Sequence, residues 1–415
     1  RLTADMVGWR LGATAVALTG MSQFDGYDLT TFQHQDTADR SRNRLAAGRI
    51  WAEFGGSASD WSGQASASYL ASSNRNEIDA APINRTWGSR RTLGAQVERR
   101  FTTGSIAHRL ILAAEDERET FHARDTLYAG FTNQDRTRTH QGFTAEWRGE
   151  KGGWNGGLAV RRDRFNRFKD AASLRASLHA PLTQTLVLAG SYAEGIAQPT
   201  FFDLYGFFPG NFVGNPALRT ESSKGYEVGL RWREGDLRAS ATYFRQRLTD
   251  EIVDIFDPLT FLQTSANRKG ASYRKGIETA VGWSADERLH LSANYTFLDA
   301  DEPNAAEGRS PELRRPRHSG AMIVDGRLGR FTYGASLAYV GKRRDRRDNF
   351  PYDLVRLGSY CLADAQVAHA LVSRVDLTLR GSNLLDQRYQ DSFGYRTEGR
   401  GIFVGIRLAD RRSSP

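Results

Sequence analysis

The segment "RLHLSANYTF", residues 288–297, alternates between apolar and polar side chains along its whole length. Every second position is apolar, and the residues at these positions are Leu289, Leu291, Ala293, Tyr295 and Phe297. Arginine, histidine, serine, asparagine and threonine occupy the positions between them. A period of two places alternate side chains on opposite faces of a β-strand. The segment therefore predicts a strand whose two faces meet different surroundings.

The same alternation recurs from one end of the chain to the other. Clear examples are residues 226–232, 237–243, 375–380 and 402–408. About eighteen such segments can be counted between Trp9 and Leu408, and helical spacing with capping signals is nearly absent. The sequence therefore predicts an all-β fold.

The mean hydropathy of −0.55 does not decide between a soluble protein and a membrane barrel. No apolar run approaches the roughly 20 residues that a membrane-spanning helix needs. A strand of a membrane barrel needs only ~9–11 residues, of which every second one is apolar. Spanning helices are therefore excluded, whereas spanning strands are not.

The connections between the predicted strands sort into two kinds. Tight turns are expected at 233–236, 284–288 and 326–330. Long polar and aromatic loops are expected at 22–42, 122–140, 198–222, 250–270, 341–358 and 386–399. Short turns at one end and long loops at the other are typical of an outer-membrane barrel. A soluble sandwich would not sort its loops in this way, and no repeat of 20–50 residues indicates a propeller or a solenoid.

Composition and motifs exclude several classes of function. The chain carries 57 lysines and arginines against 48 acids, for a net charge of +9, but the basic residues are spread along the chain and form no patch or tail. This distribution argues against nucleic-acid binding. The single cysteine, Cys361, excludes an internal disulfide. The eight histidines are scattered and no catalytic motif stands out, so we expect no enzyme activity.

Several stretches resemble the TonB-dependent outer-membrane receptors. They are "GIAQPTFFDLYG", "GNPALRTESSKGYEVGLRW", "YRKGIETAVGW", "LRRPRHSG" and "RGSNLLDQRYQDSFGYRTEGRGIFVGIRL". Their order and spacing hold over roughly residues 180–408. Within that family the chain looks most like the vitamin B12 (cobalamin) receptors, on "LYGFF", "LRRPRH" and "NLLDQRYQDSFGYRTEGR".

The resemblance implies a fold and a location. The family fold is a transmembrane antiparallel β-barrel of 22 strands in the outer membrane, closed by an N-terminal plug domain. No part of this sequence resembles the plug, so we expect residues 1–408 to form a barrel that begins after the first family strands and residues 409–415 to form a polar tail. A family hairpin is also expected to be absent around residues 84–104. The expected partners are outer-membrane lipid, lipopolysaccharide and the TonB energy-coupling protein, which acts through the plug.

The resemblance also implies a function. The first expectation is active uptake of a large, scarce nutrient, with cobalamin as the ligand. A ferric-siderophore or haem receptor is the alternative, because arginine-rich segments at 161–169 and 341–348 suit an anionic ferric chelate better than a nearly neutral corrinoid. A passive porin-like channel and an adhesive barrel are further alternatives.

Four loop acids match, in order, positions at which cobalamin receptors bind calcium. They are Asp28, Asp36, Asp39 and Asp79. Ca²⁺ takes six to eight oxygen ligands, which carboxylates from two neighbouring loops supply well. The alternative is that they are solvated acids on polar loops. No other cofactor is expected.

Five further residues are candidates for the ligand site. Arg314, Tyr352 and Tyr395 fall on or near positions that line the site in cobalamin receptors, and the aromatic composition of its loop adds Phe207 and Phe208. Arginine donates to amide and phosphate oxygens, and tyrosine offers apolar area with one hydroxyl. The competing interpretation is a basic residue on a loop or on the lumen wall for Arg314 and loop-on-loop packing for the two tyrosines.

Overall fold

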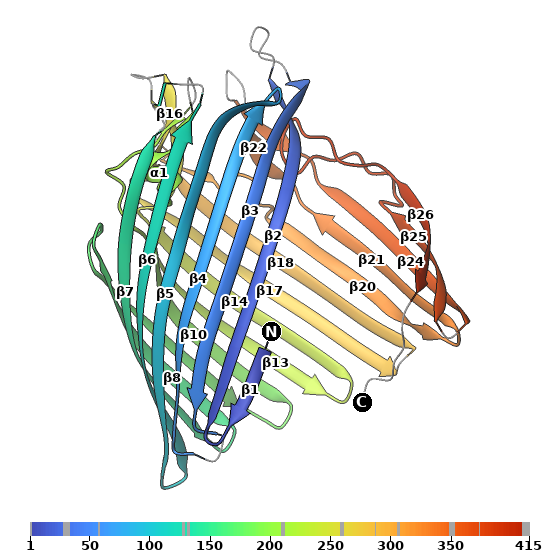
Figure 1. Ribbon diagram of the computed structural model, residues 1–415. Coiled ribbons are helices and arrows are strands. Elements are labelled where there is room, and N and C mark those ends of the chain that lie inside the picture. The colour runs from blue at the N-terminus through green and yellow to red at the C-terminus, as the bar shows by residue number, and fades with distance from the viewer. Residues whose placement is uncertain are drawn as a thin grey trace. The chain divides into compact units, whose positions relative to one another are not determined.

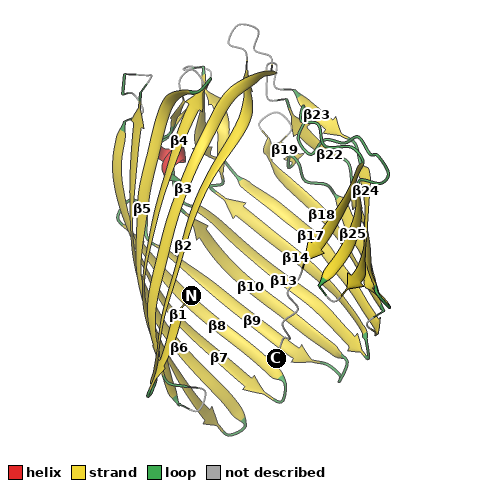
Figure 2. Cartoon of the chain, turned by 45° about the vertical axis from the view of Figure 1, so that its right-hand side comes forward, coloured by secondary structure: helices red, strands yellow, loops and turns green. Residues whose placement is uncertain are grey.

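Long antiparallel strands dominate the computed structural model (Figure 1). The structure describes residues 2–27, 34–56, 59–126, 129–130, 133–208, 212–257, 261–286, 288–304, 308–347, 353–372 and 374–408. Twenty strands belong to one antiparallel sheet, two more strands form a separate hairpin, and four short strands form a third sheet. Figure 2 shows the short helix α1 among these strands. The predicted all-β fold class is confirmed, and the main sheet has two strands more than the eighteen segments counted in the sequence.

The chain divides into two compact units. Unit 1 comprises residues 1–177, 193–223 and 249–269, and unit 2 comprises residues 178–192, 224–248 and 270–415. Four strands have residues in both units: β9 (Ala171–Pro181), β10 (Leu186–Ala197), β13 (Glu221–Glu234) and β14 (Leu237–Thr249). The units are described separately below.

In unit 1 the first eight strands each pair with the next one along the chain. They are β1 (Leu2–Met6), β2 (Trp9–Tyr27), β3 (His34–Phe54), β4 (Trp61–Ile78), β5 (Ala81–Thr103), β6 (Ile106–Asp125), β7 (Gln134–Lys151) and β8 (Trp154–Phe165). The unit also holds α1 (Phe201–Tyr205), β11 (Phe207–Phe208), β12 (Phe212–Val213), β15 (Ile252–Asp257) and β16 (Leu262–Asn267). Strands β11, β12, β16 and β15 form the small sheet.

Unit 2 repeats the antiparallel pattern. Its strands are β17 (Ala271–Asp286), β18 (Leu289–Asn304), β19 (Gly308–Pro311), β20 (His318–Leu328), β21 (Phe331–Val340), β24 (Tyr360–Val372), β25 (Val375–Ser382) and β26 (Gly401–Leu408). A separate hairpin joins β22 (Arg343–Arg346) to β23 (Leu354–Leu357). The predicted tail, residues 409–415, lies outside the described residues.

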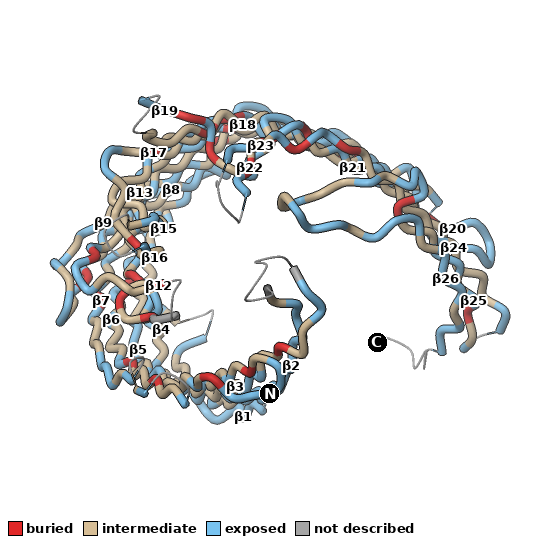
Figure 3. The backbone as a smooth tube through the Cα atoms, turned by 90° about the horizontal axis from the view of Figure 1, so that it is seen from above, coloured by how far each residue is buried: buried red, intermediate tan, exposed pale blue. Residues whose placement is uncertain are grey.

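The neighbouring strands β5, β6 and β7 of unit 1 each have an apolar and a polar face. On the apolar face, Leu112 of β6 lies opposite Val97 of β5 and Ala145 of β7. On the polar face, Glu117 lies opposite Thr92 and His140. Leu112 is 60% exposed, and Figure 3 shows that exposed and intermediate residues dominate the strands. Exposed apolar columns of this kind indicate a sheet that meets a non-aqueous surrounding.

Tight turns define one end of these strands, here named the turn end; the opposite end is the loop end. In unit 1, Gly152 and Gly153 join β7 to β8 with φ of 54° and 84°. Two successive positive φ values suit a two-residue hairpin turn, which glycine adopts without strain. In unit 2, the predicted tight turns at 233–236 and 326–330 are confirmed, because β14 begins at Leu237 and β21 at Phe331.

Tryptophans gather at the turn end of the apolar face in unit 1. Trp9, Trp61, Trp147 and Trp154 each lie within four residues of a strand terminus and are 40–50% exposed. An amphipathic indole with one apolar and one wet side is favoured where hydrocarbon meets water. The apolar band therefore begins at this row.

Two loop predictions need correction. The predicted loops at 22–42 and 122–140 are largely strand, because β2 and β3 reach Tyr27 and His34, and β6 and β7 reach Asp125 and Gln134. The charged side chains there end the apolar pattern but leave backbone pairing intact. The predicted loops at 250–270 and 341–358 contain the hairpins β15–β16 and β22–β23. Among the described residues, no helix is long and apolar enough to cross a membrane.

Candidate functional site

Three charged residues lie side by side on the polar face of unit 1, near the loop end. Arg90 of β5, Glu119 of β6 and Arg138 of β7 are directly opposite one another. Arg90 Nε donates to Glu119 Oε1 at 2.8 Å, and Arg138 Nε donates to Glu119 Oε2. Glu119 is 8% exposed. Two cations share one buried carboxylate, and Arg90 also lies 3.5 Å from the carboxylate of Glu117.

The triad holds helix α1 in place. Arg138 Nη1 donates to the carbonyl of Pro199 at 2.7 Å, and its guanidinium lies 4.5 Å from the ring centre of Phe201. Phe201 also stacks on Phe121 of β6, at 5.2 Å and an interplanar angle of 9°. Cation–π contacts of this kind contribute most where water is excluded. The helix is therefore docked on strand side chains of unit 1.

The local sequence explains why a helix starts here. Thr200 is the N-cap, and it forms a capping box with Asp203. The Asp203 N–H donates to Thr200 Oγ1 at 3.1 Å, and Asp203 Oδ2 accepts from the Thr200 N–H at 2.7 Å. These two bonds satisfy backbone donors that a short helix otherwise leaves open. Leu204 is the buried residue of this helix and is fully inaccessible to solvent.

Tyr205, at the end of α1, lies between two guanidinium groups. Arg136 of β7 is 4.5 Å and Arg167 is 5.1 Å from the tyrosine ring centre. Arg167 is fixed by donating to the carbonyl of Pro216 at 3.0 Å. Aromatic rings flanked by planar cations form a surface suited to flat anionic ligands.

A cavity of about 720 Å³ lies beside the triad. Its lining includes the apolar Leu18, Leu45 and Leu70 as well as Arg90 and Phe121. Leu18 and Leu45 are directly opposite each other on β2 and β3. An apolar wall with a few placed polar groups is the usual composition of a small-molecule site.

The loop end of unit 2 is organised around Asp345, which is fully buried. Its carboxylate accepts from Arg314 Nε at 2.7 Å, from the Phe393 N–H at 2.7 Å and from the Arg346 N–H at 2.9 Å. Burial alone would raise the pKa of Asp345, but the Phe393 N–H, the Arg314 guanidinium and the Arg346 N–H outweigh it and hold the pKa below its ordinary value. These contacts form a latch, named here the Asp345 latch, between hairpin β22–β23 and residues 390–395.

A second set of contacts supports the latch. Arg343 Nη2 donates to the Gln390 carbonyl at 2.5 Å and to Asp391 Oδ1 at 3.0 Å. Asp391 Oδ1 also accepts from the Tyr360 hydroxyl at 2.7 Å. Arg343 lies 5.2 Å from the ring centre of Tyr360, and its side chain is almost completely buried. The long connection before β26 is therefore fixed by polar contacts.

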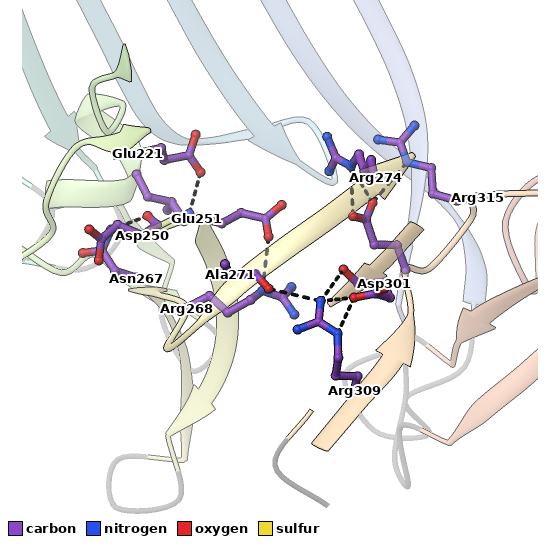
Figure 4. A network of polar contacts seen from close by, with 12 residues as sticks. Glu221, Asp250, Glu251, Asn267, Arg268, Ala271, Arg274, Asp301, Arg309 and Arg315 are labelled. Atoms are coloured by element: carbon purple, nitrogen blue, oxygen red, sulfur yellow. Dashed lines mark hydrogen bonds and ion pairs between the residues drawn. The ribbon is translucent and has the colours of Figure 1, made fainter. Parts of the chain in front are cut away.

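Further ion pairs brace the loop regions of each unit (Figure 4). In unit 1, Arg268 Nε lies 3.3 Å from Glu251 Oε2. In unit 2, Arg309 bridges the carboxylate of Asp301 and the carbonyl of Ala271. Arg274 Nε donates to both carboxylate oxygens of the buried Glu312, at 2.9 and 3.0 Å. A two-oxygen contact of this kind has higher geometric specificity than a single bond.

The predicted ligand-site residues fall into two groups. Arg314 and Tyr395 lie in unit 2, where Arg314 is held by Asp345 and Tyr395 is two residues from Phe393. Tyr395 is 54% exposed. Phe207 and Phe208 form β11 and pair with β12, but their side chains are outside the description, and Tyr352 lies outside the described residues.

The structure brings two of the four predicted calcium ligands together. Asp39 is buried, and its Oδ1 accepts from the Asp79 N–H at 3.0 Å. Asp79 Oδ1 accepts from the Ala38 N–H at 3.4 Å. Asp36 is exposed on β3, and Asp28 lies outside the described residues. Within the described part of the chain, no group of three or more metal-binding side chains occurs.

Sequence reasoning missed the residues that organise both loop ends. Arg90, Glu119 and Arg138 become a triad only through strand register, which alternation alone does not give. Asp345 sits within a charged run and carries no local sign of burial. The one available signal was the capping box, because Thr200 followed three residues later by Asp203 is readable in the sequence.

Residues 4–384 match the protein family described as "TonB dependent receptor-like, beta-barrel". The siderophore receptor PirA from Acinetobacter baumannii is similar in structure, with a TM-score of 0.79 and 14% identity, over 98% of this chain and 69% of that one. The iron transporter FrpB from Neisseria meningitidis gives a TM-score of 0.76 and 11% identity, over 97% and 69% of the two chains. The ferric enterobactin receptor PfeA from Pseudomonas aeruginosa gives 0.71 and 15%, over 96% and 70%.

Proposed function

Because the chain belongs to the TonB-dependent receptor-like β-barrel family, we propose that it is the barrel of a receptor that takes up an anionic ferric chelate. The family consists of outer-membrane receptors and transporters, not enzymes. The observation that carries the ligand class is the guanidinium–aromatic site of unit 1. Arg136, Arg138 and Arg167 there present cations beside the rings of Phe201 and Tyr205.

This proposal favours the ferric chelate over cobalamin, the first expectation from the sequence. The three similar structures are named as a siderophore receptor, an iron transporter and a ferric enterobactin receptor. An anionic chelate gains charge-assisted hydrogen bonds from arginine that a nearly neutral corrinoid gains only in part. Arg314 and Tyr395 are proposed as a separate candidate ligand surface within unit 2.

Uptake also needs a gate and an energy source. The lumen of a 22-stranded barrel is wide enough to need a plug. We therefore propose that transport depends on a plug domain and on the TonB protein, with lipid around the apolar face. A passive channel would need neither.

Equilibrium binding to the purified receptor tests the ligand class. We expect saturable binding of a ferric siderophore with a dissociation constant in the micromolar range or below, about 100-fold tighter than cyanocobalamin, which corresponds to ~2.7 kcal/mol. The dissociation constants of haem and ferric citrate are measured in the same assay. Tighter binding of cyanocobalamin than of every ferric chelate would overturn the choice of ligand. An absence of saturable binding would favour the passive channel.

We also propose that Ca²⁺ binds where Asp39 and Asp79 meet, with Asp28 and Asp36 as further ligands. The segments that carry Asp39 and Asp79 are joined by hydrogen bonds, and carboxylate oxygens are the ligands that a hard cation prefers. Millimolar Ca²⁺ should raise the melting temperature of the protein, and Asp28→Asn should remove at least half of this rise. The control is Asp60→Asn, an acid at the turn end. An equal rise with Mg²⁺, or a full rise in the Asp28 variant, would contradict the site.

A further inference from the structure

Two neighbouring rows of residues cross six strands of unit 1 on the face that carries the triad. Residues directly opposite each other on adjacent strands share a face, and Figure 1 shows β2–β7 side by side. The first row runs from β2 to β7 through Leu18, Leu45, Ser72, Gly88, Phe121 and Arg136. The second row lies two residues nearer the turn end and runs through Val16, Ala47, Leu70, Arg90, Glu119 and Arg138.

Both rows change character between β4 and β5. On β2–β4 every residue of the two rows is aliphatic except Ser72. On β5–β7 the same rows carry the triad, Phe121 and Arg136, with Gly88 at the boundary. The face therefore has an aliphatic half and a charged half at the same height along the strands.

The aliphatic half exposes apolar surface on a face that is otherwise polar. Leu18 is 59% exposed and Val16 is 48% exposed. Removal of such surface from water is favourable, and contiguous exposed apolar surface marks binding grooves. Leu18, Leu45 and Leu70 are named here the aliphatic patch. The patch is therefore suited to an apolar group that comes from outside the described chain.

The cavity of about 720 Å³ beside the triad lies across the boundary between the two halves. The aliphatic patch lines one part of it, and Phe121 and Phe201 line another part together with Arg90. Between them lie Ser72 and Gly88, which are directly opposite each other and are the smallest residues of the first row. The volume lies in the range of about 300–1,000 Å³ that is usual for small-molecule sites.

The shape of the apolar group follows from the side chains that line the cavity. Phe121 and Phe201 already stack on each other, and the guanidinium of Arg138 lies over Phe201. Much of their ring surface is thus used within the protein. The remaining apolar lining is the aliphatic patch, which offers branched side chains and no flat ring. This lining favours a flexible aliphatic chain over an aromatic group.

We propose that the ferric chelate carries a fatty acyl chain, and that this chain lies in the cavity against the aliphatic patch. The anionic head then lies beside the arginines of the charged half, where charge-assisted hydrogen bonds are available. A fully hydrophilic chelate would leave the patch in contact with water. The inference rests on the proposed ferric-chelate function and deepens it, because it names an amphiphilic class of chelate.

The test compares two chelates that differ only in the chain. Both are citrate dihydroxamates loaded with Fe³⁺, in which one hydroxamate is N-acetylated. The second hydroxamate carries acetyl in one chelate and octanoyl in the other. The two chelates share their iron ligands and their net charge. Equilibrium binding to the purified receptor gives the ratio of their affinities, and a general loss of stability affects both affinities alike.

Two variants change the cavity in opposite ways. Leu18→Asn replaces part of the aliphatic patch by a polar group, and Ser72→Phe fills the space between the patch and Phe121. The matched controls lie in unit 2, where Ile323 of β20 is directly opposite Ser292 of β18. Both residues are exposed, as Leu18 and Ser72 are. The controls are Ile323→Asn and Ser292→Phe.

The octanoyl chelate should bind the unmodified receptor at least about 30-fold more tightly than the acetyl chelate, since each fully buried methylene strengthens binding about fourfold. This affinity ratio should fall at least about fivefold in Leu18→Asn and in Ser72→Phe, because less of the chain is buried. The ratio should stay unchanged in the two controls.

Two outcomes would overturn the inference and leave the proposed function standing. The first is equal affinity for the two chelates, which is also expected if another protein segment covers the aliphatic patch in the intact receptor. The second is a ratio that neither cavity variant lowers, because the chain then gains its affinity elsewhere, as in a detergent micelle. Failure of both chelates to bind would reject the proposed function and this inference together.

Discussion

Replacement of Arg138 by methionine should undock helix α1 and weaken ferric-chelate binding about 100-fold, which corresponds to ~2.7 kcal/mol. The substitution removes one of the two cations on the buried Glu119, the hydrogen bond to the Pro199 carbonyl and the stacking on Phe201. Breaking a buried ion pair costs about 3–5 kcal/mol when one partner is left unpaired, and Arg90 still contacts Glu119, so we expect the lower end of this range.

Two measurements check this prediction. Limited chymotrypsin digestion should cleave at Phe201 to Tyr205 faster in the variant, and equilibrium binding should show the loss of affinity. The matched control is Arg148→Met, because Arg148 lies on the same strand and pairs with Glu146 near the turn end. Unchanged digestion and affinity in the Arg138 variant would contradict the role of the triad.

Replacement of Asp345 by asparagine should release residues 390–395 from hairpin β22–β23. The variant loses a buried charge that accepts three hydrogen bonds, and the Arg314 guanidinium loses its ion-pair partner. Bonds to a charged group contribute about 1.5–3 kcal/mol each, so local opening should become at least 100-fold more frequent. Hydrogen exchange of the Phe393 amide measures this opening.

The control for the latch is Asp353→Asn. Asp353 is an exposed acid of the same region, 4.0 Å from Arg347. Exchange at Phe393 should match the unmodified protein in this control. Equal protection of Phe393 in both variants would reject Asp345 as the centre of the latch.

Acidification should open the Asp345 latch in the unmodified protein, as the Asp345→Asn substitution does. The folded pKa of Asp345 is depressed, so its stabilisation is complete above the ordinary aspartate pKa of about 3.9 and is lost as the pH falls through the folded value. The latch should therefore stay closed at pH 5 and open only below pH 4. Fluorescence of a Tyr395→Trp variant reports this opening, and opening already at pH 5 would contradict the assigned contacts.

Much of the fold could be predicted because the decisive signal is local. The alternation of apolar and polar residues at 288–297 is visible within ten residues, and glycines mark the turns near Gly235 and Gly329. Strand ends at the loop end were misjudged, since Arg42 and Arg124 fall within predicted loops while their backbones remain paired. A change from apolar to charged side chains marks the edge of the apolar band, not the end of the strand.

The candidate site was less predictable because it depends on register and on long-range contact. Arg138 lies nineteen positions from Glu119 along the chain, yet the two residues form an ion pair across neighbouring strands. Arg314 was predicted as a ligand residue, and its contact with Asp345, 31 positions away, gives it a structural role as well. Single-residue patterns carry no information about such pairs.

Spin-label accessibility at neighbouring residues of β6 tests the central claim, which is that the apolar face of unit 1 meets hydrocarbon and the polar face meets water. Labels are placed singly at Leu112 and Ala113 in a Cys361→Ser background, since Cys361 is the sole cysteine. In lipid bilayers, the label at Leu112 should collide mainly with oxygen and the label at Ala113 mainly with a water-soluble nickel chelate. Equal exposure of both labels to the nickel chelate would contradict the membrane assignment and the receptor function built on it.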